Sequence, residues 1–226
     1  MEIEVRMLGM TPYLMHNPKL MDPDYEYTRA IKALTSKRKK TDQDLKEIDD
    51  LEWTGGLDWG DVGGKKTLVI PSAKPRKSFI QAGKIHKLGK NVERALKPLE
   101  MSAPLLYDGP QKLSDLARLP QFRSRLSVVV NGKRVMRCRP QFLPWGVIVR
   151  FMFRPDAGLN FDELARVVEL AGQAEGVGDN RTNGYGSSQN HVCEVGGAGY
   201  RPVEATVAGL SAFFEALRGK GASGAA

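Results

Sequence analysis

Residues 176–186 read GVGDNRTNGYG, two Gly-apolar-Gly triplets separated by five mostly polar residues. Four glycines in eleven positions indicate a backbone that needs positive φ angles, or that approaches another segment where a Cβ would not fit. Between the triplets lie enough donors to bind an anion, namely Arg181 and the amides of Asp179, Asn180, Thr182 and Asn183. A turn that follows a helix is the alternative explanation for the glycines.

The composition favours a folded protein with a phosphate-rich partner. The 226 residues include 34 Lys and Arg against 26 Asp and Glu, which gives a net charge of +8. With 41% hydrophobic residues the chain can bury a core, so global disorder is excluded. A positive charge favours nucleic acid as the partner, although an indifferent basic surface has the same charge.

No pattern predicts a metal site, a cofactor or a membrane span. The two cysteines, Cys138 and Cys193, are far apart, and the three histidines are scattered. This spacing favours neither a zinc site nor a disulfide framework. The N-terminus lacks the features of a signal peptide, and no stretch approaches 20 apolar residues, so we expect a cytoplasmic protein.

The periodicity of apolar residues predicts an α+β fold. Strands are expected at 2–9, 67–70, 146–153 and 191–195, with a hairpin over 126–139 that turns at Asn131-Gly132. Helices are expected in two pieces over 24–52 and at about 75–97, 161–172 and 204–217. This order predicts a single ferredoxin-like or RRM-like domain with an antiparallel sheet. Residues 17–66 would be a helical insertion after the first strand, and 219–226 a flexible tail.

The glycine motif resembles the signature of the RAMP superfamily of CRISPR-associated RNA-binding proteins. Gly176, Gly178, Gly184 and Gly186 match its glycines, with Val177 and Tyr185 as the apolar members. Ile70-Pro71-Ser72 before a basic helix and the segment Leu8–Leu14 are similar to further parts of its backbone subunits. The resemblance implies that the loop and first helix contact the nucleic-acid backbone and that subunits polymerise along a strand. A CRISPR subunit and a stand-alone, phage-encoded strand-coating relative both fit it.

The helix expected at about 75–97 is almost uniformly basic. Together with Lys74 just before it, it carries eight Lys and Arg residues against the single acid Glu93. Like charges at i,i+3 and i,i+4 repel one another by a few tenths of a kcal/mol per pair, and a bound phosphate relieves this repulsion. A solvated face is the alternative. The residues predicted to bind phosphate here are Lys74, Arg76, Lys77, Lys84 and Lys87.

The remaining candidates for nucleic-acid contacts are strand arginines and loop aromatics. Arg137, Arg139 and Arg150 are expected on one face of neighbouring strands, as in an RRM-type sheet that meets RNA. Bases would stack on Trp53, Trp59, Tyr185 or Trp145, each of which packing would equally explain. In the glycine loop the predicted contacts are Gly176, Gly178, Asn180, Arg181, Gly184 and Tyr185.

These features predict a non-enzymatic protein that binds single-stranded DNA or RNA largely independently of sequence and assembles as a homo-oligomer or filament. Two alternatives remain open. One is a metal-independent, RAMP-type endoribonuclease that processes hairpin RNA, with His16 or His86 as the acid or base. The other is an assembly subunit whose basic patch meets an acidic protein.

Overall fold

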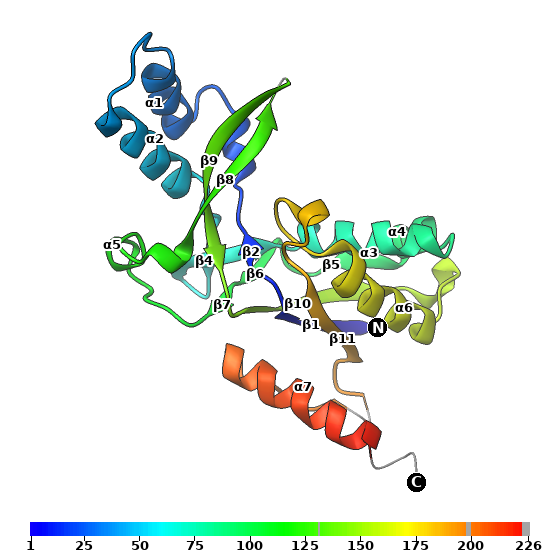
Figure 1. Cartoon of the computed structure of the whole chain (residues 1–226). Helices are drawn as coiled ribbons and strands as arrows, with labels where there is room; N and C mark the ends of the chain where they lie inside the picture. Colours follow the sequence, from blue (N-terminus) through cyan, green and yellow to red (C-terminus); the bar gives the residue numbers. More distant parts are fainter. Residues whose placement is uncertain (131, 198–199, 223–226) are drawn as a thin grey trace. The chain divides into compact units, whose positions relative to one another are not determined.

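The computed structural model describes residues 1–130, 132–197 and 200–222, and Figure 1 shows the order of their elements. The chain divides into two compact units. The first unit comprises Met1–Tyr13, Gly60–Asp108 and the chain from Leu143 onwards, and the second comprises Leu14–Trp59 and Gly109–Phe142. The expected insertion comprised residues 17–66 alone, whereas the second unit also contains residues 109–142.

The first unit is built on an antiparallel sheet in the spatial order β11-β1-β10-β5. Its strands are β1 (Glu2–Gly9), β5 (Leu96–Pro98), β10 (Trp145–Phe153) and β11 (Ser188–Glu194), and β7 (Leu106–Tyr107) also pairs with β10. A smaller sheet contains β3 (Trp59–Val62), β4 (Lys65–Pro71) and β6 (Ser102–Pro104). In the main sheet Val5 of β1 lies between Val149 and Val192 of its two neighbours.

Three helices cover one face of the main sheet (Figure 1). They are α3 (Ala73–Ile85), α4 (Gly89–Ala95) and α6 (Phe161–Leu170), and a π-helical turn extends α6 over Ala171–Glu175. The Phe79 ring of α3 packs edge-on against Phe151 of β10, with ring centroids 6.0 Å apart. Helices segregated on an antiparallel sheet define the α+β class, so this prediction is confirmed.

The opposite face of the sheet carries a buried ion pair. Glu4 and Arg6 are 4% and 1% exposed, and the Arg6 Nε donates to Glu4 Oε1 at 2.7 Å. The C-terminal segment closes over the pair, because Arg6 also donates to the Arg201 carbonyl at 2.6 Å and lies 4.5 Å from the centroid of the Phe213 ring. Tyr200 adds a hydroxyl donor to the Glu4 carboxylate at 3.4 Å. These contacts anchor the last helix to β1.

The last helix, α7, spans Val207–Ala222 and is longer than the sequence predicts. It therefore includes residues 219–222 of the expected flexible tail, and residues 223–226 lie outside the described part of the chain. Its Leu210 packs on Gly146 of β10, where an added Cβ would lie 2.4 Å from the leucine Cδ1. The sheet surface at β1 and β10 is thus covered by α7.

The expected single helix over 75–97 is wrong, because the chain turns after α3. Lys87 adopts a left-handed conformation with φ of 61°. The Leu88 N–H donates to the Gly83 carbonyl at 2.7 Å, and the Lys87 N–H donates to the Lys84 carbonyl at 3.1 Å. This pair of bonds is a Schellman motif, which terminates α3 and lets α4 begin at Gly89.

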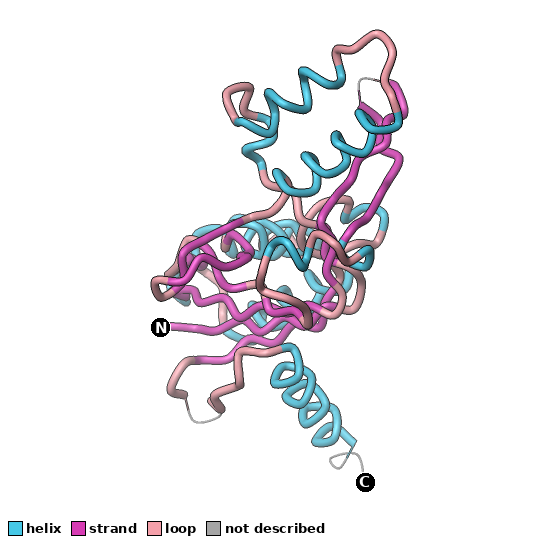
Figure 2. The backbone as a smooth tube through the Cα atoms, turned by 90° about the vertical axis from the view of Figure 1, so that its left-hand side faces the viewer, coloured by secondary structure: helices cyan, strands magenta, loops and turns pink. Residues whose placement is uncertain are grey.

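The second unit consists of a helix pair and a β-hairpin. Its elements are α1 (Glu26–Thr35), α2 (Asp42–Gly55), α5 (Leu113–Leu116), β8 (Arg123–Val130) and β9 (Lys133–Phe142), after the short strand β2 (Tyr13–Leu14). Figure 2 shows α1 and α2 as neighbouring coils beside the hairpin strands. Val128 of β8 pairs with Val135 of β9, and the predicted turn residue Asn131 lies outside the described residues.

A capping box begins α2, and a tryptophan holds it in the core of the second unit. The Thr41 hydroxyl accepts from the Asp44 N–H, and the Asp44 carboxylate accepts from the Thr41 N–H. The hydrogen bond from Lys37, together with those from Thr41, lowers the pKa of Asp44 to about 2. Trp53 is fully buried and donates from Nε1 to the Phe122 carbonyl at 2.7 Å.

No helix within the described residues has both the length and the apolar character needed to cross a bilayer.

We predict that Arg6→Met lowers the free energy of unfolding by about 3 kcal/mol or more, because it leaves the Glu4 carboxylate buried without its main partner. The double variant Glu4→Gln/Arg6→Met is expected to regain part of this loss, since it removes the buried charge as well. Urea unfolding measures both. The control Arg154→Met breaks a solvent-exposed pair with Asp156 and leaves stability nearly unchanged. Equal effects of Arg6→Met and Arg154→Met would contradict the structural role of the buried pair.

The free energy of unfolding is also expected to decrease as the pH is lowered, because His191 is buried. Burial, and then the positive charge of Arg6, lowers the pKa of this imidazole below its ordinary 6.5. The unfolded chain therefore binds the proton more readily than the folded one. The contribution of His191 is fully present above about pH 6.5 and is lost as the pH falls through the lower folded-state pKa. His191→Gln should flatten this part of the pH profile of the free energy of unfolding. A profile of the variant that runs parallel to that of the native chain would refute the assignment.

Candidate nucleic-acid interface

The two glycine triplets of residues 176–186 lie against each other and form the neck of a loop. The Val177 N–H donates to the Gly186 carbonyl at 2.9 Å, and the Gly176 N–H donates to the Ala171 carbonyl at 2.9 Å. A Cβ added at Gly186 would lie 1.7 Å from the Val177 carbonyl oxygen. Gly176 and Gly186 have φ angles of 64° and 72°. These glycines are therefore required by close backbone packing as well as by conformation.

At the tip of the loop, several amides are already used within the loop. The Asn180 N–H donates to the Asp179 carboxylate at 2.9 Å, and the Asn183 and Gly184 N–H groups donate to the carbonyls of residues 180 and 181. The expectation that the amides of Asn180 and Asn183 hold an outside anion is therefore wrong. The cationic group of the tip is Arg181, whose side chain is 28% exposed and lies 4.0 Å from Glu175.

The loop is fixed to the segment that follows β1. The Thr11 hydroxyl donates to the Gly184 carbonyl at 2.7 Å, and the Gly186 N–H donates to the Pro12 carbonyl at 2.9 Å. The backbone carbonyl of Thr11 in turn accepts from Nε1 of Trp145 at 2.8 Å. Thr11 and Pro12 were not among the predicted site residues, and the Thr-Pro pair after a strand was the signal available for them.

Helix α3 begins beside the same segment. Nζ of Lys74 lies 3.4 Å from the Tyr13 hydroxyl and 6.0 Å from the centroid of its ring. Further along α3, the Ser78 hydroxyl donates to the carbonyl of Ala171, in the turn that leads into the glycine loop. The loop and the first helix, which are about a hundred residues apart in the sequence, are therefore neighbours in the first unit (Figure 1).

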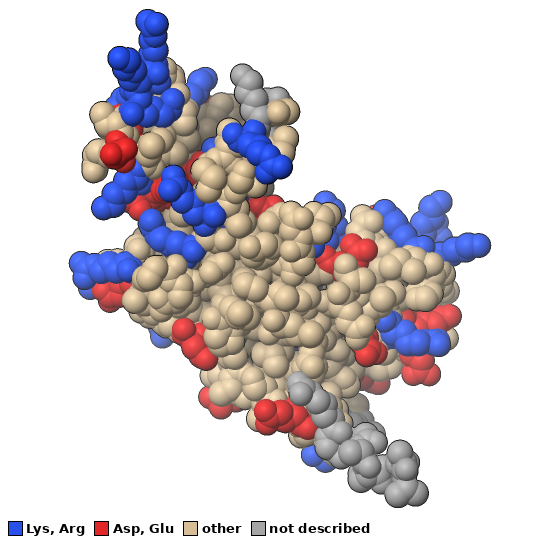
Figure 3. Space-filling model, viewed as in Figure 1, with Lys and Arg blue, Asp and Glu red and all other residues tan. Residues whose placement is uncertain are grey.

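The lysines of α3 form a stripe along the helix, whereas its arginine, Arg76, is used within the fold. Lys74, Lys77 and Lys84 follow one another at i, i+3 and i+10, opposite the buried Phe79 and Ala82. Lys77, Lys84 and the terminating Lys87 are exposed, and Lys74 is half-buried. Figure 3 shows lysine and arginine atoms over the region of α3 and α4, with acidic atoms beside them.

Arg76 has a different role from the one predicted. Its Nε donates to the Leu96 carbonyl at 2.8 Å, and its Nη2 donates to the Glu93 carbonyl at 2.5 Å. The guanidinium thus satisfies carbonyl groups at the end of α4, which is a common use of arginine at a helix C-terminus.

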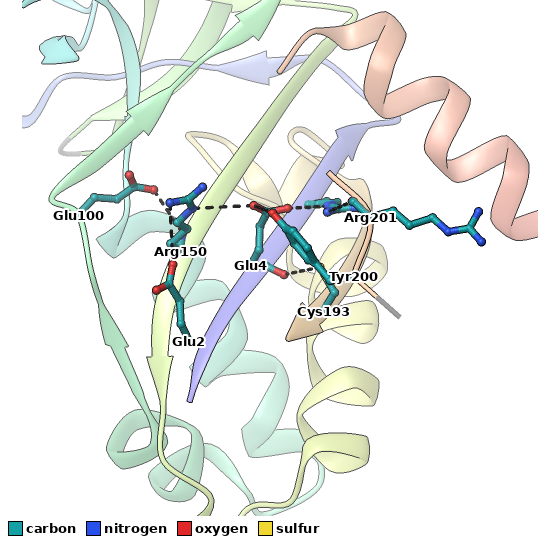
Figure 4. Close-up of polar contacts among 8 residues, drawn as sticks. Glu2, Glu4, Glu100, Arg150, Cys193, Tyr200 and Arg201 are labelled. Carbon is teal, nitrogen blue, oxygen red and sulfur yellow. Dashed lines mark hydrogen bonds and ion pairs between the residues drawn. The ribbon is translucent and has the colours of Figure 1, made fainter. Parts of the chain in front are cut away.

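The strand arginines do not share one sheet face, so this prediction is wrong. Arg137 and Arg139 lie on β9, which pairs with β8, whereas Arg150 lies on β10 between β1 and β5. Arg137 forms an ion pair with the buried Glu52. Arg150 lies 3.9 Å from the carboxylates of both Glu2 and Glu4 (Figure 4). Each of these two charges is thus balanced by a local acid.

Two of the predicted stacking residues are core residues. Trp53 belongs to the core of the second unit, and Trp145 is fully buried against Tyr13, with ring centroids 5.3 Å apart. Neither can present a ring face to a base. Trp59 at the start of β3 and Tyr185 in the neck of the glycine loop are half-buried.

The two histidines proposed for the endoribonuclease alternative belong to different units. His16 lines a cavity of the second unit, and His86 is an exposed residue at the C-terminal end of α3. No group of three or more His, Cys, Asp or Glu side chains within the described part of the chain is arranged to hold a metal ion.

No protein-family model and no curated protein matches this sequence. Among solved structures, the chain is similar to one in a structure titled "Type IV-B CRISPR Complex", with a TM-score of 0.42 and 10% sequence identity. The superposition covers 92% of this chain and 96% of that chain. Likeness at this level is too low to carry a conclusion, so the case for function rests on the residues themselves.

We predict that Gly186→Ala disrupts the loop far more than Gly184→Ala. A Cβ at Gly184 meets nothing within 4 Å, so alanine there adds only the cost of its φ of 84°, about 1 kcal/mol. At Gly186 the Cβ must also displace the Val177 carbonyl. Thermal unfolding should show the larger loss for Gly186→Ala, and NMR shifts should change throughout residues 176–186. Equal losses would mean that the two triplets are not packed as described.

Proposed function

We propose that this chain binds single-stranded nucleic acid through the phosphate backbone, with no chemical step, and assembles side by side along the strand. The binding surface would be the loop–helix surface, defined as the side chains of Lys74, Lys77, Lys84, Lys87 and Arg181. One observation carries the proposal: residues 11–13 join the glycine loop to the start of α3, through Thr11 on Gly184 and Tyr13 on Lys74.

The charge of α3 supports a polyanionic ligand. The helix contains Lys74, Arg76, Lys77 and Lys84 and no acid over its 13 residues. From Lys74 to Lys84 its lysines extend over about 15 Å along the helix axis, which is long enough to meet more than one phosphate of a strand. Phosphate binding would relieve the repulsion between these lysines and release counterions, and both effects favour association at low salt.

The burial of two aromatic residues supports binding that does not depend on the base sequence. Trp53 and Trp145 are buried, so neither is available for stacking. Lysine and arginine side chains contact phosphates without reading bases. We therefore propose similar affinities for different sequences of the same length, and assembly along the strand remains part of the proposal on the basis of the RAMP resemblance.

We predict that the triple variant Lys77→Ala/Lys84→Ala/Arg181→Ala weakens binding to labelled single-stranded oligo(dT) and oligo(U). Each lost phosphate contact should reduce the salt slope of log K by about 0.7. Fluorescence anisotropy across a salt series measures the slope. The matched control is Lys65→Ala, which removes an exposed lysine of β4 in the same unit. Absence of binding by the native chain at low salt, or an equal loss in the control, would contradict the proposal.

A further inference from the structure

A large cavity in the second unit has no role in the proposed nucleic-acid surface. Its volume is about 1090 Å³, and every residue that lines it belongs to the second unit. Two of its walls are helix faces. From α1 it is lined by Thr28, Ile31, Lys32 and Thr35, and from α2 by Leu45, Ile48, Asp49 and Glu52. Both sets have the i, i+3, i+4, i+7 spacing of one continuous helix face. The hairpin strands β8 and β9 form the third wall.

The apolar surface around this cavity is not covered by the described chain. Helix α1 contains no buried residue, although burial of one face normally stabilises such a helix. Met21 is 81% exposed, Met136 is 48% exposed and Leu45 is 41% exposed, and all three line the cavity. Exposed apolar side chains that are gathered at one concave site mark an interaction surface.

The shape of the cavity fits an α-helix. The neighbouring helices α1 and α2 each line the cavity with one helix face. In a helix bundle, a third helix fills the space between two such faces. A helix about 10 Å across occupies about 420 Å³ per turn. The volume of about 1090 Å³ therefore corresponds to about two and a half turns.

The charge of the cavity selects an acidic helix. Its Lys and Arg side chains are Lys32, Lys40, Arg125, Arg137 and Arg139, against the two acids Asp49 and Glu52. Both acids are already paired, Asp49 with Arg125 at 3.1 Å and Glu52 with Arg137. The lining therefore has a positive excess that a partner with carboxylates on its flanks would balance.

The chemistry of the walls favours a protein helix over nucleic acid. The apolar members of the lining are Leu, Ile, Val and Met, and none is aromatic. Aliphatic and methionine side chains are typical of grooves that accept amphipathic helices, whereas bases bind by stacking on aromatic rings. We propose that this cavity is the docking groove for an acidic amphipathic helix of a partner protein. This inference does not depend on the loop–helix surface, which lies in the other unit.

The test uses the full-length chain and two labelled probe peptides of about four helical turns. Both have leucine at i, i+3, i+4 and i+7, and their flanks carry glutamate in one and lysine in the other. Fluorescence anisotropy should show at least about tenfold tighter binding of the glutamate peptide, which corresponds to 1.4 kcal/mol.

Two groove variants and one control locate the site. Lys32→Glu/Lys40→Glu reverses exposed charges at the rim, and Met136→Glu puts a charge into the apolar wall. Each should weaken binding of the glutamate peptide by about tenfold or more. Lys46→Glu, on α2 but outside the cavity lining, should have little effect. Circular dichroism checks that all the variants are folded.

Four outcomes would overturn the inference. The first two are no binding of the glutamate peptide and equal binding of both peptides. The third is an effect of the Lys46→Glu control as large as that of the groove variants. The fourth is displacement of the peptide by a single-stranded oligonucleotide in the Lys77→Ala/Lys84→Ala/Arg181→Ala variant. Sedimentation that reveals a dimer sensitive to Met136→Glu would instead assign the groove to a second copy of the chain. Failure of the nucleic-acid proposal would leave the peptide result unchanged, because the two tests probe different units.

Discussion

The close approach of the Val177 and Gly186 backbones is the constraint on which the candidate site depends. Their hydrogen bond of 2.9 Å joins the two glycine triplets, and no side chain fits at Gly186. Because the Gly186 N–H also bonds to Pro12, the same contact ties the loop to the end of β1. Tyr13 then links this segment to Lys74 on α3. These three contacts together hold Arg181 on the same part of the unit as the basic helix.

The second constraint is the closed face of the main sheet. In an RRM-type module, RNA lies across the exposed sheet. Here β1 carries the buried Glu4–Arg6 pair on that face, and Tyr200, Phe213 and α7 cover it. The charge of Arg150 at its edge is balanced by Glu2 and Glu4. A nucleic-acid ligand of this unit is thus directed to the loop–helix surface, where lysines are exposed.

Local patterns predicted the parts of the fold that depend on local chemistry. Alternating residues in 2–9 and 146–153 identified β1 and β10, and the core spacing of 161–172 identified α6. The end of α3 could not be predicted in this way, because a lysine, and not a glycine, takes the left-handed position at Lys87. Likewise, the glycine spacing predicted a loop with positive φ angles or close backbone packing, but it did not reveal that Asn180 donates its amide to Asp179.

The misassigned site residues share one cause, which is contact between distant parts of the sequence. Arg137 was expected to face RNA, yet its partner Glu52 lies 85 residues earlier in the chain. Trp53 was expected to stack on bases, yet its indole donates to Phe122, 69 residues later. Arg76 was expected to bind phosphate, yet its guanidinium donates to the Leu96 carbonyl, 20 residues later. A single sequence shows the residue types of these pairs, but it does not show which distant residues are in contact.

In the proposed binding mode, a single strand follows the glycine loop and the lysine stripe of α3. Photo-crosslinking of the full chain to 4-thiouridine-substituted oligo(U), followed by mass spectrometry of the linked peptides, tests it most directly. We expect crosslinks within residues 10–13, 74–87 and 176–186. Crosslinks confined to the hairpin of β8 and β9 or to α7, with none at those three segments, would contradict it.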